Sequence, residues 1–200
     1  MRALDLHITD SCNLRCQQCS HGIPKLKDHS YNMSINELQE IKNTIIDPKL
    51  TRINVSGGEP TAHPEFELFC NTLKGLFSGY RLGLMSNGFK AEQYKDIILN
   101  TFDSAVFTEY PNVALSDDWP RDIVTLHKLN HRSILIPGTA DDTNCAFRDF
   151  PMVRNYMIYP CCRVFGLKLH LGEVPEDIGL PLKDYKSLKC NSITCSKCWT

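Results

Sequence analysis

The sequence lacks an excess of charge of either sign, and it lacks any long apolar run. Its 200 residues contain 22 lysines and arginines against 23 aspartates and glutamates, which gives a formal net charge of -1 at pH 7. A protein that tracks the phosphates of duplex nucleic acid needs a basic surface, so we expect no duplex nucleic acid partner. No stretch approaches membrane-spanning length, and the N-terminal segment lacks the apolar core of a signal peptide. We therefore expect a cytoplasmic protein that does not contact a membrane.

Cysteine is nearly absent from the middle of the chain, although the sequence contains ten cysteines in all. Between Cys19 and Cys145 there is only Cys70, which shares an apolar helical stripe with Phe66 and Leu73. We expect Cys70 to be a packed core thiol. The cysteines of a cytoplasmic protein cannot be assumed to form disulfides, so their grouping at the two ends of the chain predicts metal sites.

Between the two groups of cysteines, short runs rich in β-branched and apolar residues alternate with amphipathic segments. Ser34 and Glu37 have the spacing of a capping box, and they open a segment with apolar residues on one helical face. The predicted strands cover residues 4–9, 52–56, 81–85, 104–108 and 133–136, and the predicted helices cover 34–46, 91–99, 118–129 and a segment that begins near residue 63. This alternation is typical of βα units, so we expect an α/β fold with a parallel sheet.

The loops that directly follow the predicted strands carry the chemically informative residues. Ligands of parallel sheets bind beyond the carboxyl ends of the strands, where these loops meet. In chain order the loops contain Cys12, Cys16 and Cys19 at a C-x3-C-x2-C spacing, GGEP at residues 57–60, SNG at residues 86–88, and Glu109 with Tyr110. We expect all four loops to converge on one end of the sheet.

Three thiolates in one loop suit an iron-sulfur cluster that keeps one iron open. They can hold three irons of a [4Fe-4S] cluster, whereas an electron-transfer cluster normally has all four irons bound by the protein. Together with GGEP and SNG at successive strand ends, the cysteine loop resembles the radical S-adenosylmethionine (SAM) superfamily. The resemblance implies a partial (β/α) barrel of the radical SAM type, with about five to six parallel strands. Because thiol triplets also bind zinc, a zinc-stapled βα domain is the alternative.

The resemblance also implies a reaction and a role for each matching residue. SAM would bind the open iron, and its reductive cleavage would give a 5'-deoxyadenosyl radical that takes a hydrogen atom from the substrate. Cys12, Cys16 and Cys19 would ligate the cluster and would thus be the catalytic residues. The residues implied for SAM binding are Gly57, Gly58, Glu59, Pro60, Ser86 and Asn87. Among these, Glu59 and the glycine backbone would receive the methionine ammonium group, and Ser86 and Asn87 would face the carboxylate or the ribose.

The SNG loop, Gln18 and the pair of Glu109 and Tyr110 each leave an alternative or a departure from the family pattern. SNG is also ordinary turn chemistry, so a plain turn is the alternative for that loop. Gln18 stands where the family commonly has an aromatic residue that covers the adenine, so adenine packing must come from another residue. Glu109 and Tyr110 would lie where a substrate sits, and the alternative is a solvated carboxylate beside a half-buried tyrosine.

The chain from residue 141 onward has a different character, because the βα rhythm stops and cysteines return. A segment this short buries little apolar area of its own, so a bound metal would contribute much of its stability. We expect a small, cysteine-rich β-hairpin extension built from residues 155–161 and 167–171. The predicted metal ligands are Cys145, Cys161, Cys195 and Cys198, with Cys162 as the alternative to Cys161 and Cys190 as a spare thiol.

This extension resembles the twitch domain, the shorter relative of the SPASM domain, which in some radical SAM enzymes binds a second, auxiliary [4Fe-4S] cluster. We therefore expect a radical SAM domain over residues 1–140 and a twitch-like domain over residues 141–200. An auxiliary cluster can accept or pass on an electron, which favours an oxidoreductase or maturase that oxidises or crosslinks a small polar metabolite or a short peptide. The resemblance implies an electron donor such as flavodoxin or ferredoxin. The alternatives are a structural zinc tail with redox-neutral chemistry or glycyl-radical activation, and a non-catalytic metal-binding module.

Overall fold

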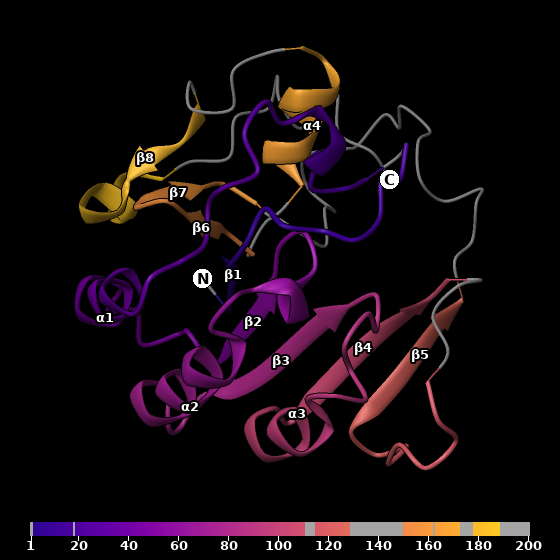
Figure 1. Cartoon of the computed structure of the whole chain (residues 1–200). Helices are drawn as coiled ribbons and strands as arrows, with labels where there is room; N and C mark the ends of the chain where they lie inside the picture. Colours follow the sequence, from indigo (N-terminus) through magenta and orange to yellow (C-terminus); the bar gives the residue numbers. More distant parts are fainter. Residues whose placement is uncertain are drawn as a thin grey trace.

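The computed structural model describes residues 2–17, 19–110, 115–128, 150–161, 163–172 and 178–188. One sheet runs through these ranges, and three helices from the first half of the chain lie along it (Figure 1). The strands are β1 (Ala3–His7), β2 (Arg52–Ser56), β3 (Arg81–Ser86), β4 (Ser104–Glu109), β5 (Val124–Lys128), β6 (Met152–Arg154), β7 (Met157–Tyr159) and β8 (Leu180–Pro181). The helices are α1 (Ile35–Thr44), α2 (Phe66–Leu76), α3 (Lys95–Thr101) and α4 (Val164–His170), with short 3-10 helices at Ile23–Lys25, Pro60–Ala62 and Leu182–Ser187. None of the helices in these ranges has the length and apolar character needed to cross a membrane.

The strand order places the first strand of the chain inside the sheet. The order is β5-β4-β3-β2-β1-β6-β7-β8, so β1 lies between β2 and β6. The strands from β1 to β6 pair in parallel, whereas β7 and β8 are antiparallel additions at one edge. In the described part of the chain the sheet stays open, with β5 and β8 as its edges. The predicted partial α/β barrel of about five to six parallel strands is thus confirmed.

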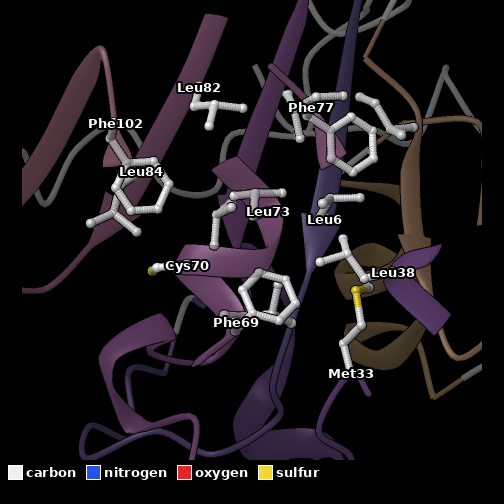
Figure 2. Packing of buried hydrophobic residues seen from close by; sticks show 14 of the residues in the cluster. Leu6, Met33, Leu38, Phe69, Cys70, Leu73, Phe77, Leu82, Leu84 and Phe102 are labelled. Carbon is white, nitrogen blue, oxygen red and sulfur yellow. The ribbon is translucent and has the colours of Figure 1, made fainter. Parts of the chain in front are cut away.

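The main core lies between the sheet and α1, α2 and α3. Leu6 of β1 is fully buried there, as are Phe69 and Leu73 of α2 (Figure 2). Cys70 is also fully buried on α2, so the prediction of a packed core thiol is confirmed. Burial of large apolar side chains is the main source of folding free energy, and here it fixes the strands whose ends carry the informative loops.

The predicted helix after Ser34 is α1, and a side-chain cap begins it. The Ser34 hydroxyl accepts a hydrogen bond from the Glu37 backbone N–H at 3.1 Å. The second hydrogen bond of a capping box, from the Ser34 backbone N–H to the Glu37 carboxylate, does not form, so this part of the prediction is wrong. The Glu37 carboxylate has other partners. It accepts hydrogen bonds from the Tyr31 hydroxyl at 3.0 Å and from the Tyr156 backbone N–H at 2.9 Å. Glu37 thus links α1 to the C-terminal hairpin.

One predicted helix is a strand. Residues 118–129 were expected to be helical, but Val124–Lys128 forms β5 and pairs in parallel with β4, with Val124 opposite Ala105. The run of Val124, Thr125 and Leu126 contains two β-branched residues, and pairing with an existing strand outweighs weak local helix propensity. The strand predicted at residues 133–136 lies outside the described residues.

The C-terminal hairpin is present, and its strand β7 lies within the predicted segment 155–161, but its partner strand is β6 and not the predicted segment 167–171. β6 and β7 pair through a two-residue turn at Asn155 and Tyr156, whose φ angles are 50° and 56°. Left-handed conformations at both positions match the right-handed twist of hairpin strands. The predicted second strand at residues 167–171 falls largely within α4 instead. Since β6 pairs with β1, the extension continues the main sheet, and the domain boundary near residue 140 stays a prediction.

Asp5 lies on the face of β1 opposite to Leu6, and it is buried with one carboxylate oxygen unpaired. The Ser56 hydroxyl donates to Asp5 Oδ2 at 2.9 Å, whereas Oδ1 has no hydrogen-bond partner among the described residues. Burial raises the pKa of Asp5 from 3.8 to about 7, and the hydrogen bond from Ser56 opposes this shift only in part. The folded state keeps a proton that the unfolded state loses between these two values. The free energy of unfolding therefore falls as the pH rises from about 4 to about 7.

We expect Asp5→Asn to be more stable than the native protein at pH 8, with an advantage that shrinks towards acid pH. A shift of about three pKa units sets an upper limit of about 4 kcal/mol, and the buried amide N–H groups of asparagine would offset part of it. Urea unfolding at several pH values between 5 and 8 measures the difference. A difference that stays constant across this range would mean that folded Asp5 is not protonated there.

Candidate metal and cofactor site at the carboxyl ends of the strands

The cysteine loop and the GGEP loop are paired through their main chains. Beyond the end of β1, the Gly58 N–H donates to the Thr9 carbonyl at 2.7 Å and the Glu59 N–H donates to the Ser11 carbonyl at 2.8 Å. These contacts extend the β1–β2 pairing past the formal strand ends. The position of Cys12 is therefore fixed from the adjacent loop.

The two glycines of GGEP are required by this close approach of two backbones. A Cβ atom added at Gly58 would stand 2.3 Å from the Ser11 carbonyl oxygen, and one added at Gly57 would stand 2.6 Å from the Thr9 carbonyl oxygen. Gly57 also has a φ of 150°, which side chains rarely adopt. Glycines were predicted here for close approach to a ligand. The structure adds a second reason, because the cysteine loop itself occupies the space of a side chain.

Glu59 joins the GGEP loop to the SNG loop. Its side chain is fully buried, and Oε1 accepts from the Thr61 N–H at 3.0 Å, the Thr61 hydroxyl at 2.7 Å and the Ser86 hydroxyl at 2.7 Å. Oε2 accepts from the Asn87 N–H at 2.7 Å. Burial raises the pKa of Glu59, and these four hydrogen bonds oppose the shift. The first role of Glu59 is thus to hold the two loops together, and its predicted contact with the methionine ammonium group stays a prediction.

The SNG loop contacts the cysteine loop through Asn87. The Asn87 side-chain N–H donates to Asn13 Oδ1 at 2.9 Å and lies 3.9 Å from Cys12 Sγ. The side-chain oxygen of Asn87, Oδ1, accepts from the Phe89 N–H at 3.0 Å, which fixes the orientation of the side-chain amide. Asn13 was not among the predicted site residues. Pro60, which was among them, is buried and starts the 3-10 helix that follows Glu59.

The three predicted ligand thiols are partly exposed, and two of them accept hydrogen bonds from backbone N–H groups. The Cys12 sulfur accepts from the Leu14 N–H at 3.4 Å, and the Cys19 sulfur accepts from backbone N–H groups of the turn that follows it. The Cys16 thiol donates to the hydroxyl oxygen of Tyr110, with Sγ and Oη 3.6 Å apart. Burial raises the pKa of Cys12 to about 11 and also raises the pKa of Cys19, so the free side chains are thiols that lose protons when a metal binds.

This donor set suits an iron-sulfur cluster. Its sulfurs lie on one loop and are partly exposed, and those of Cys12 and Cys19 receive N–H hydrogen bonds of the kind by which proteins tune such clusters. In the parts of the chain that the structure describes, no three or more His, Cys, Asp or Glu side chains stand close enough to hold a single metal ion. A [4Fe-4S] cluster attaches each thiolate to a different iron and so uses more widely spaced ligands. Three thiols on one loop thus fit a [4Fe-4S] cluster that keeps one iron open.

A buried ion pair at the start of the cysteine loop was missed by the sequence prediction. Asp10 is fully buried, and its carboxylate receives the Arg154 guanidinium and His7 Nε2, the latter at 2.7 Å. Burial alone would raise the pKa of Asp10, but the hydrogen bonds from His7 and Arg154 outweigh it and hold the pKa below its usual value. No local sequence signal pairs Asp10 with Arg154, which is 144 residues away.

Of the four predicted C-terminal metal ligands, only Cys161 lies in the part of the chain that the structure describes. Cys161 follows β7 and is buried against Met152, Tyr159 and Phe165. The other predicted or alternative ligands, Cys145, Cys162, Cys190, Cys195 and Cys198, lie outside the described residues. The auxiliary metal site therefore stays a prediction.

The part of the chain that contains this site is similar in sequence to known proteins. The family described as Radical SAM superfamily matches residues 6–110, more than half of the 200 residues. The chain is 30% identical over 129 residues to a GTP 3',8-cyclase of Peptoclostridium acidaminophilum, which covers 64% of this chain and 34% of that protein. It is 30% identical over 87 residues to an S-adenosylmethionine-dependent nucleotide dehydratase of Thermoplasmatales archaeon (strain ISO4-H5), which covers 44% of this chain and 29% of that protein. The chain thus spans about a third of the length of these curated relatives.

Among solved structures, the fold is similar to that of BtrN in complex with AdoMet and 2-DOIA. The TM-score is 0.61 over 97% of this chain and 84% of that chain, at 17% sequence identity, so this likeness concerns the fold alone. The family match itself includes the three cysteines, GGEP, SNG and the end of β4. With these loops joined as the structure shows, the chain belongs to the radical SAM superfamily.

Proposed function

We propose that this chain binds a [4Fe-4S] cluster through Cys12, Cys16 and Cys19 and uses it to cleave SAM reductively. The product radical would abstract hydrogen from a small polar metabolite or a short peptide. The observation that carries the proposal is the three accessible thiols at the carboxyl end of a parallel sheet, held from two sides by GGEP and SNG. Membership in the superfamily implies both the cluster and SAM.

The residues of the chain would position the reactants. When bound, the cluster supplies the electron that divides SAM into methionine and a 5'-deoxyadenosyl radical. Glu59 holds the two loops that would face the methionine group, and Asn87 donates towards the sulfur of Cys12. Tyr110 lies beside the sulfur of Cys16, at the edge where a substrate would enter, and it is half-buried.

The substrate and the second cluster are the finer parts of the proposal. We propose oxidation or crosslinking assisted by an auxiliary [4Fe-4S] cluster on Cys145, Cys161, Cys195 and Cys198, with a flavodoxin or ferredoxin as electron donor. The curated relatives are named for reactions on nucleotides, so nucleotides belong first in a substrate panel. Small polar metabolites and short peptides follow in that panel.

The test is SAM cleavage by the full chain after anaerobic reconstitution with iron and sulfide. We expect the reduced native protein to form 5'-deoxyadenosine and methionine in equal amounts, measured by mass spectrometry. Cys16→Ala should reduce this rate below about 1% of the native rate, because a cluster ligand is lost. Cys70→Ala is the matched control, since Cys70 lies in the core and should leave both iron content and cleavage unchanged. Native-level cleavage by Cys16→Ala would contradict the proposal.

Iron and zinc analysis of the same preparations tests the second cluster. About eight irons per chain, falling to about four when Cys12, Cys16 and Cys19 are all replaced by alanine, would support an auxiliary cluster. About four irons with one zinc would leave SAM cleavage standing and make the C-terminal site a structural staple with redox-neutral chemistry.

A further inference from the structure

We infer that the C-terminal segment, residues 150–161 and 163–172, positions the cysteine loop, with Arg154 as the positioning residue at one end of the loop and α4 as the brace at the other. The consequence for SAM binding rests on the proposed function, whereas the effect on the loop itself does not. Figure 1 shows α4 beside the loop that follows β1. The segment adds contacts at both ends of the cysteine loop to those that GGEP and SNG make.

The first brace is the contact between Arg154 and Asp10. Arg154 Nε donates to Asp10 Oδ1 at 3.0 Å, and Nη2 donates to Oδ2, so the planar guanidinium binds both carboxylate oxygens. Asp10 is fully buried and stands two residues before Cys12. Its backbone N–H is bound to the Tyr31 carbonyl at 3.0 Å, so the start of the loop is held through both main chain and side chain.

Arg154 is itself held rigidly. It is the last residue of β6, which pairs with β1, and its guanidinium carbon lies 4.7 Å from the Tyr31 ring centroid and 4.9 Å from the Phe165 ring centroid. The Tyr31 hydroxyl accepts from the Asn155 N–H at 2.9 Å, which ties the adjacent hairpin turn to the same ring. Stacking between two rings fixes the plane of the guanidinium. Exchanging both partners of a buried ion pair for apolar residues of the same volume changes stability little, whereas removing one partner leaves a buried charge unpaired.

The second brace is the contact of α4 with the residues after Cys19. A Cβ atom added at Gly166 would stand 2.0 Å from the Ser20 carbonyl oxygen, so the helix and the loop touch through their backbones. One turn later, the His170 Nε2 lies 2.8 Å from the Cys19 carbonyl oxygen. The helix therefore contacts the residue of the third thiol and the residue that follows it.

The two braces hold the cysteine loop at its two ends, while GGEP and SNG contact its first half. Arg154 acts at the start, two residues before Cys12, and α4 acts at Cys19 and Ser20. The spacing of the three thiols is thus set jointly by the main sheet and by the C-terminal segment. A displacement of the segment would change that spacing and would thereby change the geometry of the SAM site.

Hydrogen exchange in the full chain without metal tests the positioning directly. We expect Arg154→Met and Gly166→Ala each to accelerate exchange at least tenfold in peptides covering residues 8–26, with peptides covering 81–86 unchanged. Arg154→Lys, which keeps the charge but not the planar fork, should give an intermediate effect. Arg81→Met removes an exposed arginine at the start of β3 and should change neither region. Unchanged exchange at residues 8–26 in all three test variants would overturn the inference.

Reconstituted protein tests the consequence for SAM. In Arg154→Met and Gly166→Ala, we expect the KM for SAM to rise at least tenfold and the change that SAM causes in the EPR spectrum of the reduced cluster to be diminished. Ile98→Val, a core substitution on α3, should lower the thermal midpoint without either effect, which separates positioning from loss of stability. Native values of KM and of the EPR change in both test variants would overturn the inference, whereas a native protein that binds no iron would contradict the proposed function alone.

Discussion

Replacing Glu59 by alanine is expected to lower the free energy of unfolding by about 3 to 5 kcal/mol and to abolish SAM cleavage. The carboxylate is fully buried and accepts four hydrogen bonds, from Thr61, Ser86 and Asn87. Alanine would leave these donors buried without an acceptor, and each buried unsatisfied donor costs about 1 to 3 kcal/mol before relaxation. Because the donors belong to two loops, the loss would also separate SNG from GGEP.

Glu59→Gln distinguishes the hydrogen-bond geometry from the volume of the side chain. An amide has one oxygen, so its N–H2 group would face either the Asn87 N–H or the three donors at Oε1. We expect a smaller loss of stability than for alanine, about 1 to 3 kcal/mol, with a strong loss of SAM binding. Thermal unfolding and equilibrium dialysis with labelled SAM measure the two effects. Glu65→Gln, at an exposed position just before α2, is the control and should change neither.

If Glu59→Gln kept full stability but lost SAM binding, the carboxylate would serve the ligand and not the loops. If it lost stability but kept SAM binding, the predicted contact with the methionine ammonium group would be wrong. Loss of both is expected from the structure, because the same carboxylate oxygens hold the loops that would bind SAM.

The fold was largely predictable because its strands are short, buried and regularly spaced. β1 to β4 were predicted within two residues of their observed ends, since apolar and β-branched runs between turn residues leave few alternatives. β5 was predicted as part of a helix over residues 118–129 although it contains two β-branched residues, and its conformation is set by pairing with β4. The second strand of the C-terminal hairpin was displaced for a similar reason, because residues 167–171 alternate in sequence yet lie mostly in α4.

The sequence predicts the motifs of the candidate site, but it does not predict the contacts that hold these motifs in place. Cys12, Gly58 and Asn87 were found because each stands in the loop that follows a strand of a parallel sheet. The partner of Asp10 is Arg154, which is 144 residues away, and no local pattern marks such a pair. The sequence also did not reveal that Glu59 joins two loops, since its hydrogen-bond partners Ser86 and Asn87 lie in another loop.

Replacing Gly58 by alanine is expected to disrupt the cysteine loop, whereas the same change at Gly75 is expected to be harmless. The added Cβ at Gly58 would stand 2.3 Å from the Ser11 carbonyl oxygen and 3.0 Å from the Asp10 carbonyl oxygen. Both neighbours are backbone atoms, so relief requires the loop to move away from β2. Overpacking of this kind costs about 1 to 3 kcal/mol. At Gly75, within α2, no atom lies within 4 Å of the added Cβ, and alanine should stabilise the helix by about 0.5 to 1 kcal/mol.

Iron content after reconstitution measures the effect of Gly58→Ala on the loop, and urea unfolding measures its effect on stability. We expect Gly58→Ala to bind substoichiometric iron at the Cys12, Cys16 and Cys19 site and Gly75→Ala to match the native protein. Since the two substitutions add the same methyl group, the difference between them reports the backbone contact and not the chemistry of alanine. Full iron loading by Gly58→Ala would mean that the loop can retreat from Gly58 without losing its ligand geometry. In that case the close contact of Gly58 with Ser11 would serve packing alone, and the position of Cys12 would depend on Asp10 and Asn87.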